Sequence, residues 1–392
     1  MSEKRHIYID FNASTPLKPD VKAAVIEGLD SYGNASSMHT AGRSANARVQ
    51  QARKAVAELL GAPPQSIVFT SGGSEANNTV FQTMRSLACS EDGSLLKTGR
   101  NEFIVSAIEH PCVLNAALYL QENGFKVTVL PVDEYGKLKM DALKAALSEK
   151  TLLVSIMTAN NEIGTVQDIK EISRLVKACG AWMHTDAVQA LGKIPLNVED
   201  LGVDYLTVSA HKIYGPKGAG ALYVKKNSPL IPLVHGGHQE NGLRAGTYNN
   251  PGIFGFGKAA EIAAGELEEY GKQMAALRDQ LKEGLLREIP NVKINGHPQD
   301  VLPNTLNVSF TGAEGEAILL AMDIQGIEAS TGSACASGSL EPSHVLVALG
   351  LGAELAHGSI RFSLGWGITK DDIFYIIEKM PPIIARLRAM AQ

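Results

Sequence analysis

Lys212 lies in the segment Ser209-Ala210-His211-Lys212, which directly follows an apolar run typical of a β-strand. A single lysine is usually a solvated surface charge. At a strand end beside a histidine, however, desolvation and neighbouring positive charge lower the pKa of the amine, and a neutral amine forms a Schiff base with an aldehyde. Lys212 is therefore a candidate for covalent chemistry with a carbonyl group.

Two further segments follow other apolar runs. Gly73 and Ser74 come after Ile67–Thr70, where backbone N–H groups at the start of a helix can hold a phosphate. Asp186 ends another run, and a buried carboxylate there needs a cationic partner such as a protonated pyridine nitrogen. A plain turn and a capping or surface carboxylate are the ordinary explanations of each feature taken singly. Together with Lys212 they supply what pyridoxal 5'-phosphate requires.

Neither a Walker lysine nor a complete G-x-G-x-x-G pattern accompanies the glycine turn, which disfavours nucleotide binding. Three polar residues join the candidate site because they follow or lie within predicted strands: His110, Asn161 and Arg361. A histidine there can stack on an aromatic cofactor or shuttle protons, although a loop histidine is more often structural. A guanidinium fixed in a strand suits a substrate carboxylate.

Cys335 lies within Ser330–Ser339, a run of small residues that predicts a mobile, exposed loop. Most cysteines are buried, so a cysteine on such a loop favours a nucleophilic thiol. Cys89, Cys112 and Cys179 accompany helical patterns, and we expect them to be core or surface thiols. With no Cys-x-x-Cys pair and no apolar secretory segment, we expect reduced thiols in a cytoplasmic protein.

The composition narrows the class of protein. The 392 residues are 45% hydrophobic and 20% charged, with 36 basic and 41 acidic residues and a net charge of −5. This balance is typical of a globular protein large enough for two domains. The negative sign and the lack of a basic run argue against nucleic acid or an anionic membrane as partner, and no metal-ligand set is expected.

Short apolar runs alternate with helical patterns over most of the chain. We expect strands at 67–70, 103–106, 127–130, 152–157, 182–185, 205–209 and 219–224. This alternation predicts an α/β fold with a mainly parallel sheet, in which ligands bind beyond the carboxyl ends of the strands. Beyond position 257 we expect a smaller α+β domain.

That domain is predicted to begin with a long charged helix over Lys258–Arg287, followed by short strands that include Thr305–Phe310 and Ser359–Ser363. A last helix opens at the capping pair Thr369 and Asp372, and we expect Pro381-Pro382 to interrupt it.

At this point the chain closely resembles the cysteine desulfurases of the NifS/IscS-like group over essentially its whole length. The segments that carry the resemblance are Glu109-His110-Pro111, Asn160-Asn161-Glu162, His184-Thr185-Asp186-Ala187-Val188-Gln189, Ser209-Ala210-His211-Lys212, Gly236-Gly237-His238-Gln239-Glu240, Arg244-Ala245-Gly246-Thr247, Gly332-Ser333-Ala334-Cys335 and Ser339-Leu340-Glu341-Pro342-Ser343-His344. The resemblance implies a fold-type-I pyridoxal phosphate enzyme with a seven-stranded, mainly parallel sheet. The large domain is expected over residues 15–257, and residues 1–14 and 258–392 are expected to form the small domain.

The resemblance also implies roles around the cofactor. Lys212 holds it as a Schiff base, Asp186 contacts the ring nitrogen, Gln189 contacts the phenolic oxygen and His110 stacks on the ring. The residues expected to hold its phosphate are Gly73, Ser74, Ser209, His211 and, across a homodimer, Thr247 of the partner subunit.

For the substrate, L-cysteine, the resemblance implies that Asn161 and Arg361 bind the carboxylate, with Asn34 nearby and Asn161 also touching the cofactor. Lys212 takes the Cα proton, and the Cys335 thiolate attacks the substrate sulfur to leave a persulfide and alanine. The sulfur then passes to an acceptor, such as an iron–sulfur scaffold protein, or to tRNA thiolation. Selenocysteine lyase, an aminotransferase and a non-catalytic scaffold subunit are the alternatives.

Overall fold

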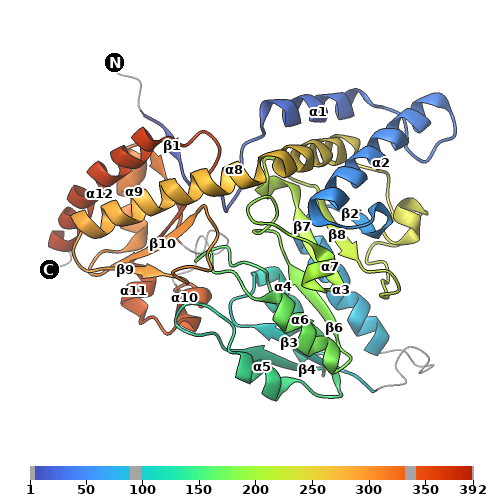
Figure 1. Cartoon of the computed structure of the whole chain (residues 1–392), viewed down its shortest axis with the longest axis horizontal. Helices are drawn as coiled ribbons and strands as arrows, with labels where there is room; N and C mark the ends of the chain where they lie inside the picture. Colours follow the sequence, from blue (N-terminus) through green and yellow to red (C-terminus); the bar gives the residue numbers. More distant parts are fainter. Residues whose placement is uncertain (1–4, 89–98, 332–340, 391–392) are drawn as a thin grey trace.

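The computed structural model describes residues 5–88, 99–331 and 341–390, which form a large and a small body joined by one long helix (Figure 1). Seven strands of the large body make one sheet in the order β2-β8-β7-β6-β5-β3-β4. Their bounds are β2 Ile67–Thr70, β3 Glu102–Ser106, β4 Lys126–Leu130, β5 Thr151–Ser155, β6 Trp182–Asp186, β7 Tyr205–Ser209 and β8 Gly220–Val224.

The sheet is parallel from β7 through β6, β5 and β3 to β4, whereas β8 runs antiparallel to both of its neighbours. The prediction of a mainly parallel, seven-stranded sheet is confirmed. Strands such as β3, β5 and β7 are buried at every position, which is why they appear in the sequence as continuous apolar runs. The predicted strand at 152–157 ends two residues early, at Ser155.

Helices cover both faces of this sheet. Their bounds are α1 Pro19–Asp30, α2 Thr40–Leu60, α3 Gly73–Ala88, α4 Pro111–Glu122, α5 Met140–Ala146, α6 Ile169–Ala178 and α7 Val198–Leu201, with 3-10 turns at Pro64–Ser66, Ala210–Lys212 and Gln239–Gly242. Apolar residues of α3 and α4 share one core cluster with the strands. Those of α2 and α6 share another, so the sheet is sandwiched between two helical layers.

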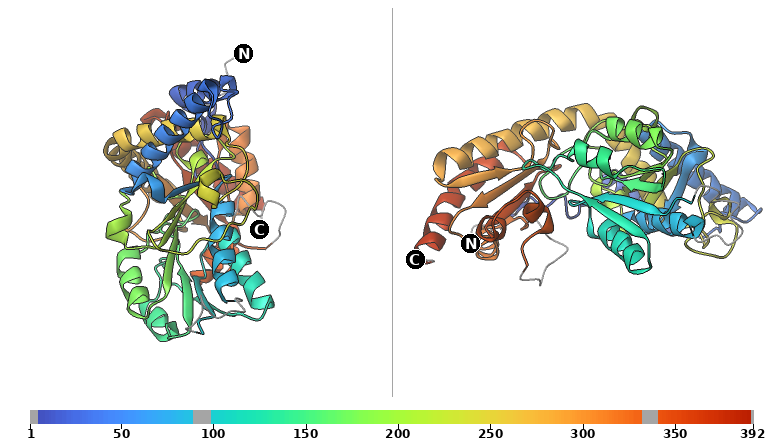
Figure 2. Two further views of the ribbon diagram at one scale, coloured as in Figure 1. Left: turned by 90° about the vertical axis from the view of Figure 1, so that its right-hand side faces the viewer. Right: turned by 90° about the horizontal axis from the view of Figure 1, so that it is seen from below.

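Helix α8 (Asn250–Glu288) has 39 residues and lies along one edge of both bodies (Figures 1 and 2). It begins eight residues before the predicted start, because the Asn249 side chain caps it by accepting the Gly252 N–H. Its first turns, including Phe256, are buried in the core of the large body, and its last turns, including Leu281, in that of the small body. One helix therefore belongs to both cores.

The small body contains a three-stranded antiparallel sheet in the order β12-β10-β9, and β1 pairs in parallel with β11. The bounds are β1 Ile7–Tyr8, β9 Val292–Asn295, β10 Thr305–Phe310, β11 Ile327–Glu328, β12 Ser359–Ser363, α9 Gly315–Ile324, α10 His344–Ala348, α11 Ala353–His357 and α12 Lys370–Met390. The two strands predicted here, β10 and β12, are confirmed to the residue.

The predicted break in the last helix is wrong. Thr369 and Asp372 do cap α12 reciprocally, but the helix continues through Pro381 and Pro382 to Met390. Ile383 and Ile384, directly after the prolines, are buried in the small core. Each buried isoleucine contributes about 1.5–3 kcal/mol, which offsets much of the cost of a proline inside a helix.

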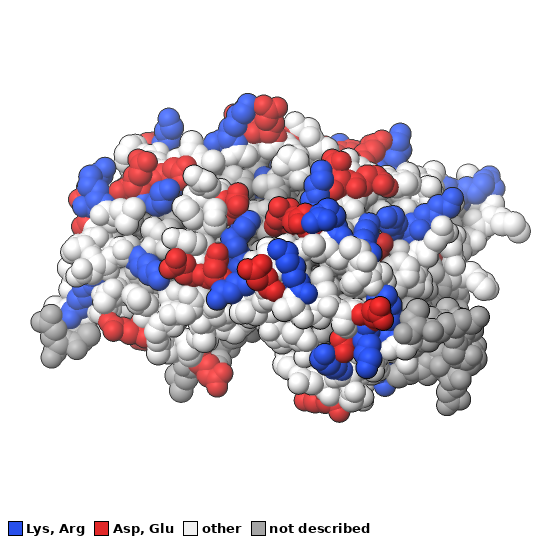
Figure 3. Space-filling model, turned by 60° about the horizontal axis from the view of Figure 1, so that its bottom comes forward, with Lys and Arg blue, Asp and Glu red and all other residues white. Residues whose placement is uncertain are grey.

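No helix within the described ranges is long and apolar enough to cross a membrane. On the face that Figure 3 presents, Lys and Arg side chains lie among Asp and Glu, and the residues drawn there in colour form no continuous surface of one sign.

Candidate active site

A cavity of about 690 Å³ lies at the carboxyl ends of the parallel strands, where the small body meets the large sheet. Ten of the predicted site residues line it: Gly73, Ser74, His110, Asn161, Asp186, Gln189, Ser209, His211, Lys212 and Arg361. Nine of them follow or end strands of the seven-stranded sheet that are far apart in the sequence, and Arg361 comes from β12 (Ser359–Ser363) of the small body. The cavity is therefore the candidate active site.

Lys212 ends the 3-10 turn that follows β7. Its Nζ donates to the carbonyl oxygens of Asn12 and Ala13 at 2.5 and 2.8 Å. The N-terminal segment thus lies directly against this amine. Two carbonyl acceptors hold the amine at the edge of the cavity.

Asp186 ends β6 and is only 5% exposed. Its Oδ2 accepts from Asn77 Nδ2 at 2.7 Å, and its Oδ1 accepts from the Val188 N–H at 2.9 Å. Both donors are neutral, so they orient the carboxylate without cancelling its charge. A protonated ring nitrogen in the cavity fits such a carboxylate.

Gly73 opens α3 at the other end of the cavity, and a Cβ at that position would come within 2.9 Å of Val188 Cγ2. Ser74, Ser209 and His211 lie beside it and also line an adjoining hollow. A helix start flanked by two hydroxyls fits a phosphate. Together with Asp186 and Lys212, this arrangement matches the phosphate, ring nitrogen and aldehyde of pyridoxal 5'-phosphate.

Two of the three histidines that line the cavity, His110 and His211, are held in the neutral form. Burial, and then the positive charges of Lys212, Lys217 and Lys193, lowers the pKa of His211 to about 4. Burial also lowers the pKa of His110, although Asp186 opposes that shift. His110 caps α4 by accepting the Cys112 N–H at Nδ1 over 3.2 Å, so the proton of its neutral ring lies on Nε2.

Cys112 is a cavity residue that we had expected to be an ordinary core or surface thiol. Its Sγ lies 3.0 Å from His110 Nδ1 and 3.1 Å from Asn77 Nδ2. Burial raises the pKa of this thiol to about 12, so it stays protonated and is a poor nucleophile. Cys335 lies outside the described residues, and its role as nucleophile stays a prediction.

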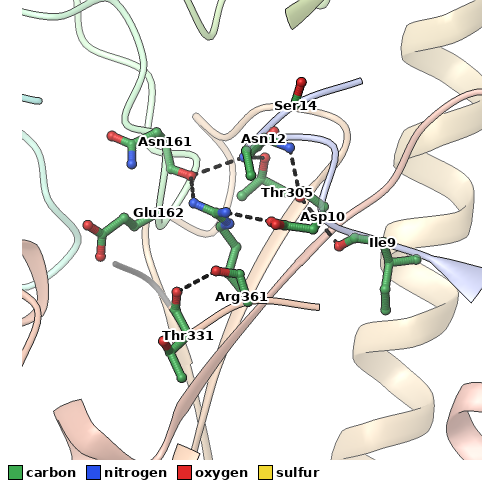
Figure 4. A network of polar contacts seen from close by, with 12 residues as sticks. Ile9, Asp10, Asn12, Ser14, Asn161, Glu162, Thr305, Thr331 and Arg361 are labelled. Atoms are coloured by element: carbon green, nitrogen blue, oxygen red, sulfur yellow. Dashed lines mark hydrogen bonds and ion pairs between the residues drawn. The ribbon is translucent and has the colours of Figure 1, made fainter. Parts of the chain in front are cut away.

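Arg361 projects from β12 of the small body and is 1% exposed. Its Nη2 pairs with Asp10 Oδ1 at 2.6 Å and its Nη1 donates to the Asn161 carbonyl oxygen at 3.1 Å (Figure 4). Both Arg361 and Asn161 line the cavity, as the predicted carboxylate site requires. The guanidinium is oriented by its own partners before any substrate arrives.

Two predicted residues do not line this cavity. Asn34 is exposed between α1 and α2, where its Oδ1 accepts the Ser36 N–H. Thr247 is exposed on the loop before α8. The role of Thr247 in a partner subunit, and that of Asn34 near the substrate, stay predictions.

Several buried or partly buried polar residues at or beside the cavity have no role assigned from the sequence: Asn12, Asn77, Glu109, Glu162, Lys193 and His344. The clearest signal available was the polarity of Asn77, which lies on the buried face of α3 one turn after Ser74. Among the residues that the structure describes, no cluster of three or more His, Cys, Asp or Glu could hold a metal ion.

Comparisons with known proteins agree with this geometry. The model of the aminotransferase class-V family matches residues 7–376. A cysteine desulfurase from Nostoc sp. is 50% identical over 386 residues, covering 98% of this chain and 94% of its own. The cysteine desulfurase IscS of Dictyoglomus turgidum is 46% identical over 389 residues, covering 99% and 97%.

Solved structures give the same result. A NifS-like protein superimposes with a TM-score of 0.90 at 39% identity, covering 98% of this chain and all of that one. The structure of SspA in complex with cysteine gives a TM-score of 0.79 at 36% identity, covering 91% and 98%.

Fold and cavity together define a fold-type-I pyridoxal phosphate-dependent transferase. Within that class, the chain belongs to the aminotransferase class-V family and, inside it, to the NifS/IscS-like cysteine desulfurases.

Proposed function

We propose that the protein removes sulfur from L-cysteine, releases L-alanine and carries the sulfur as a persulfide on Cys335. The observation that carries this proposal is the placement of three residues around one cavity: Asp186 ends β6, Lys212 follows the neighbouring strand β7, and Gly73 opens the helix after β2. A cysteine-bound relative of the same fold supports the choice of substrate.

When bound, pyridoxal 5'-phosphate supplies an aldehyde for the substrate amine and a ring that accepts electrons from the substrate Cα. Asp186 keeps the ring nitrogen protonated, and the helix start at Gly73 and Ser74 holds the phosphate. Arg361 and Asn161 bind the substrate carboxylate. The Lys212 amine takes the proton from Cα and returns a proton to the product.

Sulfur transfer balances without an external oxidant. The Cys335 thiolate forms an S–S bond with the substrate sulfur as the C–S bond breaks, and the electron pair of that bond stays with the carbon fragment. Protonation of this fragment gives alanine. The overall change is one cysteine and one protein thiol to one alanine and one protein persulfide.

The wider setting belongs to the same proposal. We infer a homodimer, supported by Tyr32 and Met38, which are 91% and 90% exposed near α1 and α2, and by the exposed Thr247. A reducing, cytoplasmic location would keep Cys335 a free thiol. The persulfide then passes to an acceptor protein, for example an iron–sulfur scaffold.

The decisive experiment combines trapping and product analysis. Borohydride reduction of the purified protein should attach the cofactor to Lys212, and incubation with L-cysteine without a keto acid should yield alanine. Cys335→Ser should keep the trapped cofactor and lose the persulfide, whereas Cys179→Ser, at the end of α6, serves as the matched control.

A cofactor trapped elsewhere, or a persulfide that persists in Cys335→Ser, would overturn the proposal. A requirement for a keto acid would indicate an aminotransferase. Cys335→Ser should also be assayed for sulfide release from cysteine and selenide release from selenocysteine. If both activities fall equally, this variant does not distinguish the protein from a selenocysteine lyase.

A further inference from the structure

Lys193 is a buried lysine to which the reaction assigns no task. It is 4% exposed, four residues after Gln189, and its Nζ donates to Gln189 Oε1 at 2.7 Å and to Asn12 Oδ1 at 3.0 Å. No carboxylate of the described residues lies within 4 Å of this amine. A lysine is almost never buried without a charged partner, so this position needs a specific reason.

The orientation of both amide partners follows from the carbonyl groups around them. Asn12 Nδ2 donates to the Asn161 carbonyl oxygen at 3.1 Å, and Gln189 Nε2 donates to the Asn12 carbonyl oxygen at 2.9 Å. A carbonyl oxygen only accepts, so each amide must present its N–H group there. The oxygen of each amide therefore faces Lys193.

Lys193 matches these two acceptors in number. Burial, and then the charges of Lys212 and Arg361, lowers its pKa far below the usual range for lysine. The amine has at least two N–H donors in either protonation state, one for each amide oxygen. Without the amine, Gln189 Oε1 would be left unsatisfied at a cost of about 1–3 kcal/mol, whereas Asn12 Oδ1 would still accept from Asn304 Nδ2 at 3.1 Å.

Gln189 is the member of this group that lines the cavity. Its oxygen is held by Lys193 and one N–H by Asn12, which leaves the second N–H as its remaining donor. The same Asn12 carbonyl oxygen also accepts from Lys212 Nζ. A displacement of Lys193 would therefore disturb the Gln189 side chain and the hydrogen bond from Lys212 Nζ to the Asn12 carbonyl oxygen.

We propose that Lys193 is a positioning residue that holds the Gln189 amide as a hydrogen-bond donor toward the phenolic oxygen of the cofactor. This inference rests on the proposed function, because it needs the cofactor in the cavity. Lys193 acts through Gln189 and touches no reacting atom.

A double-mutant cycle on the cofactor-bound protein tests this assignment. Lys193→Met removes both donors at similar volume, and Gln189→Leu removes the amide. Lys193→Met should shift the apparent pKa of the visible cofactor absorbance by about one unit, in the same direction as Gln189→Leu. In the Gln189→Leu background, Lys193→Met should add nothing further.

The control is Lys137→Met. The Lys137 amine donates to the Val166 carbonyl oxygen over 2.7 Å, and Lys137 does not line the cavity. It should lower the melting temperature without moving the absorbance titration. If Lys193→Met behaves in the same way, or if its shift adds to that of Gln189→Leu, Lys193 is only structural and the inference fails. Should Lys193→Met not fold, Lys193→Gln is judged by the same two criteria.

A second measurement separates this inference from the proposed function. In crystals of the cofactor-free protein, Lys193→Met should show the Gln189 side chain displaced from the Asn12 carbonyl oxygen, and an unchanged contact would overturn the inference. Absence of cofactor absorbance in the wild-type protein would instead overturn the proposed function.

Discussion

Asn77 donates from Nδ2 to Oδ2 of Asp186 over 2.7 Å, so the carboxylate at the end of β6 is held by a side chain of α3, the helix that opens at the phosphate end of the cavity. The groups expected to hold the ring nitrogen and the phosphate are therefore coupled through one helix. A shift of α3 would disturb both contacts together.

We expect Asn77→Leu to weaken binding of pyridoxal 5'-phosphate about tenfold or more, because a hydrogen bond to a charged group contributes about 1.5–3 kcal/mol. The dissociation constant is obtained by titrating the cofactor-free protein and following absorbance. Asn46→Leu, on the exposed face of α2, is the control. Equal affinities for wild type and Asn77→Leu would show that the backbone N–H of Val188 suffices to hold Asp186.

Replacement of Arg361 needs a variant that preserves its ion pair. Arg361→Ala would strand Asp10 and cost about 3–5 kcal/mol of stability, which would confound any kinetic effect. We expect Arg361→Lys to raise KM for cysteine about tenfold with little change in kcat, because a point charge replaces a two-pronged contact. Steady-state kinetics measure KM and kcat, and a melting curve shows whether the variant keeps its stability.

Arg388→Lys is the matched control, since Arg388 donates to carbonyl oxygens of Thr311 and Asn291 at the far side of the small body. An unchanged KM in Arg361→Lys would remove this guanidinium from the carboxylate site.

Gly73→Ala tests the fit at the start of α3. The new methyl group would meet Val188 Cγ2 at 2.9 Å, so either the helix start or Val188 must move. We expect cofactor affinity to fall about tenfold, as for the loss of one good contact to a charged phosphate. Gly271→Ala in α8 meets nothing within 4 Å and should instead stabilise the helix slightly. Similar cofactor affinities for both variants would contradict the phosphate assignment.

The stability of the protein should depend on pH through Glu109. This side chain is fully buried, and burial raises its pKa to about 8, so the folded state retains a proton that the unfolded state releases. Its contribution to stability is present below about pH 4.5 and is lost as pH rises toward about 8. Glu109→Gln removes this dependence.

Relative to wild type, Glu109→Gln should therefore gain on the order of 1–3 kcal/mol between pH 5 and pH 8. Thermal unfolding of the cofactor-free proteins across that range measures the gain, with the exposed Glu58→Gln on α2 as control. Parallel curves for wild type and Glu109→Gln would show that Glu109 does not titrate in this range.

The large sheet was predictable because its strands are short, apolar and buried on both faces, and because Asp186 and Lys212 lie at or just after strand ends. Parallel strands bring such residues to one edge without any knowledge of packing. The Pro381-Pro382 prediction failed for the opposite reason. Local backbone preference argued for a break, but burial of Ile383 and Ile384 in a core made by distant segments prevailed.

Asn12 and Lys193 could not be found from local sequence. Asn12 acquires its importance only when the N-terminal segment crosses the chain to meet Lys212, Gln189 and Thr305, more than 170 residues away. Nothing in the spacing of residues predicts such a crossing. Cys112 was assigned as an ordinary thiol because its helical pattern does not reveal that the first turn of α4 opens onto the cavity.

Helix α8 is about 58 Å long at 1.5 Å per residue, and it contributes buried side chains to both hydrophobic cores. The two bodies are therefore joined by one continuous helix whose side chains pack in both hydrophobic cores. Heat that unfolds one body would therefore also remove apolar packing from a helix that the other body needs for its own core.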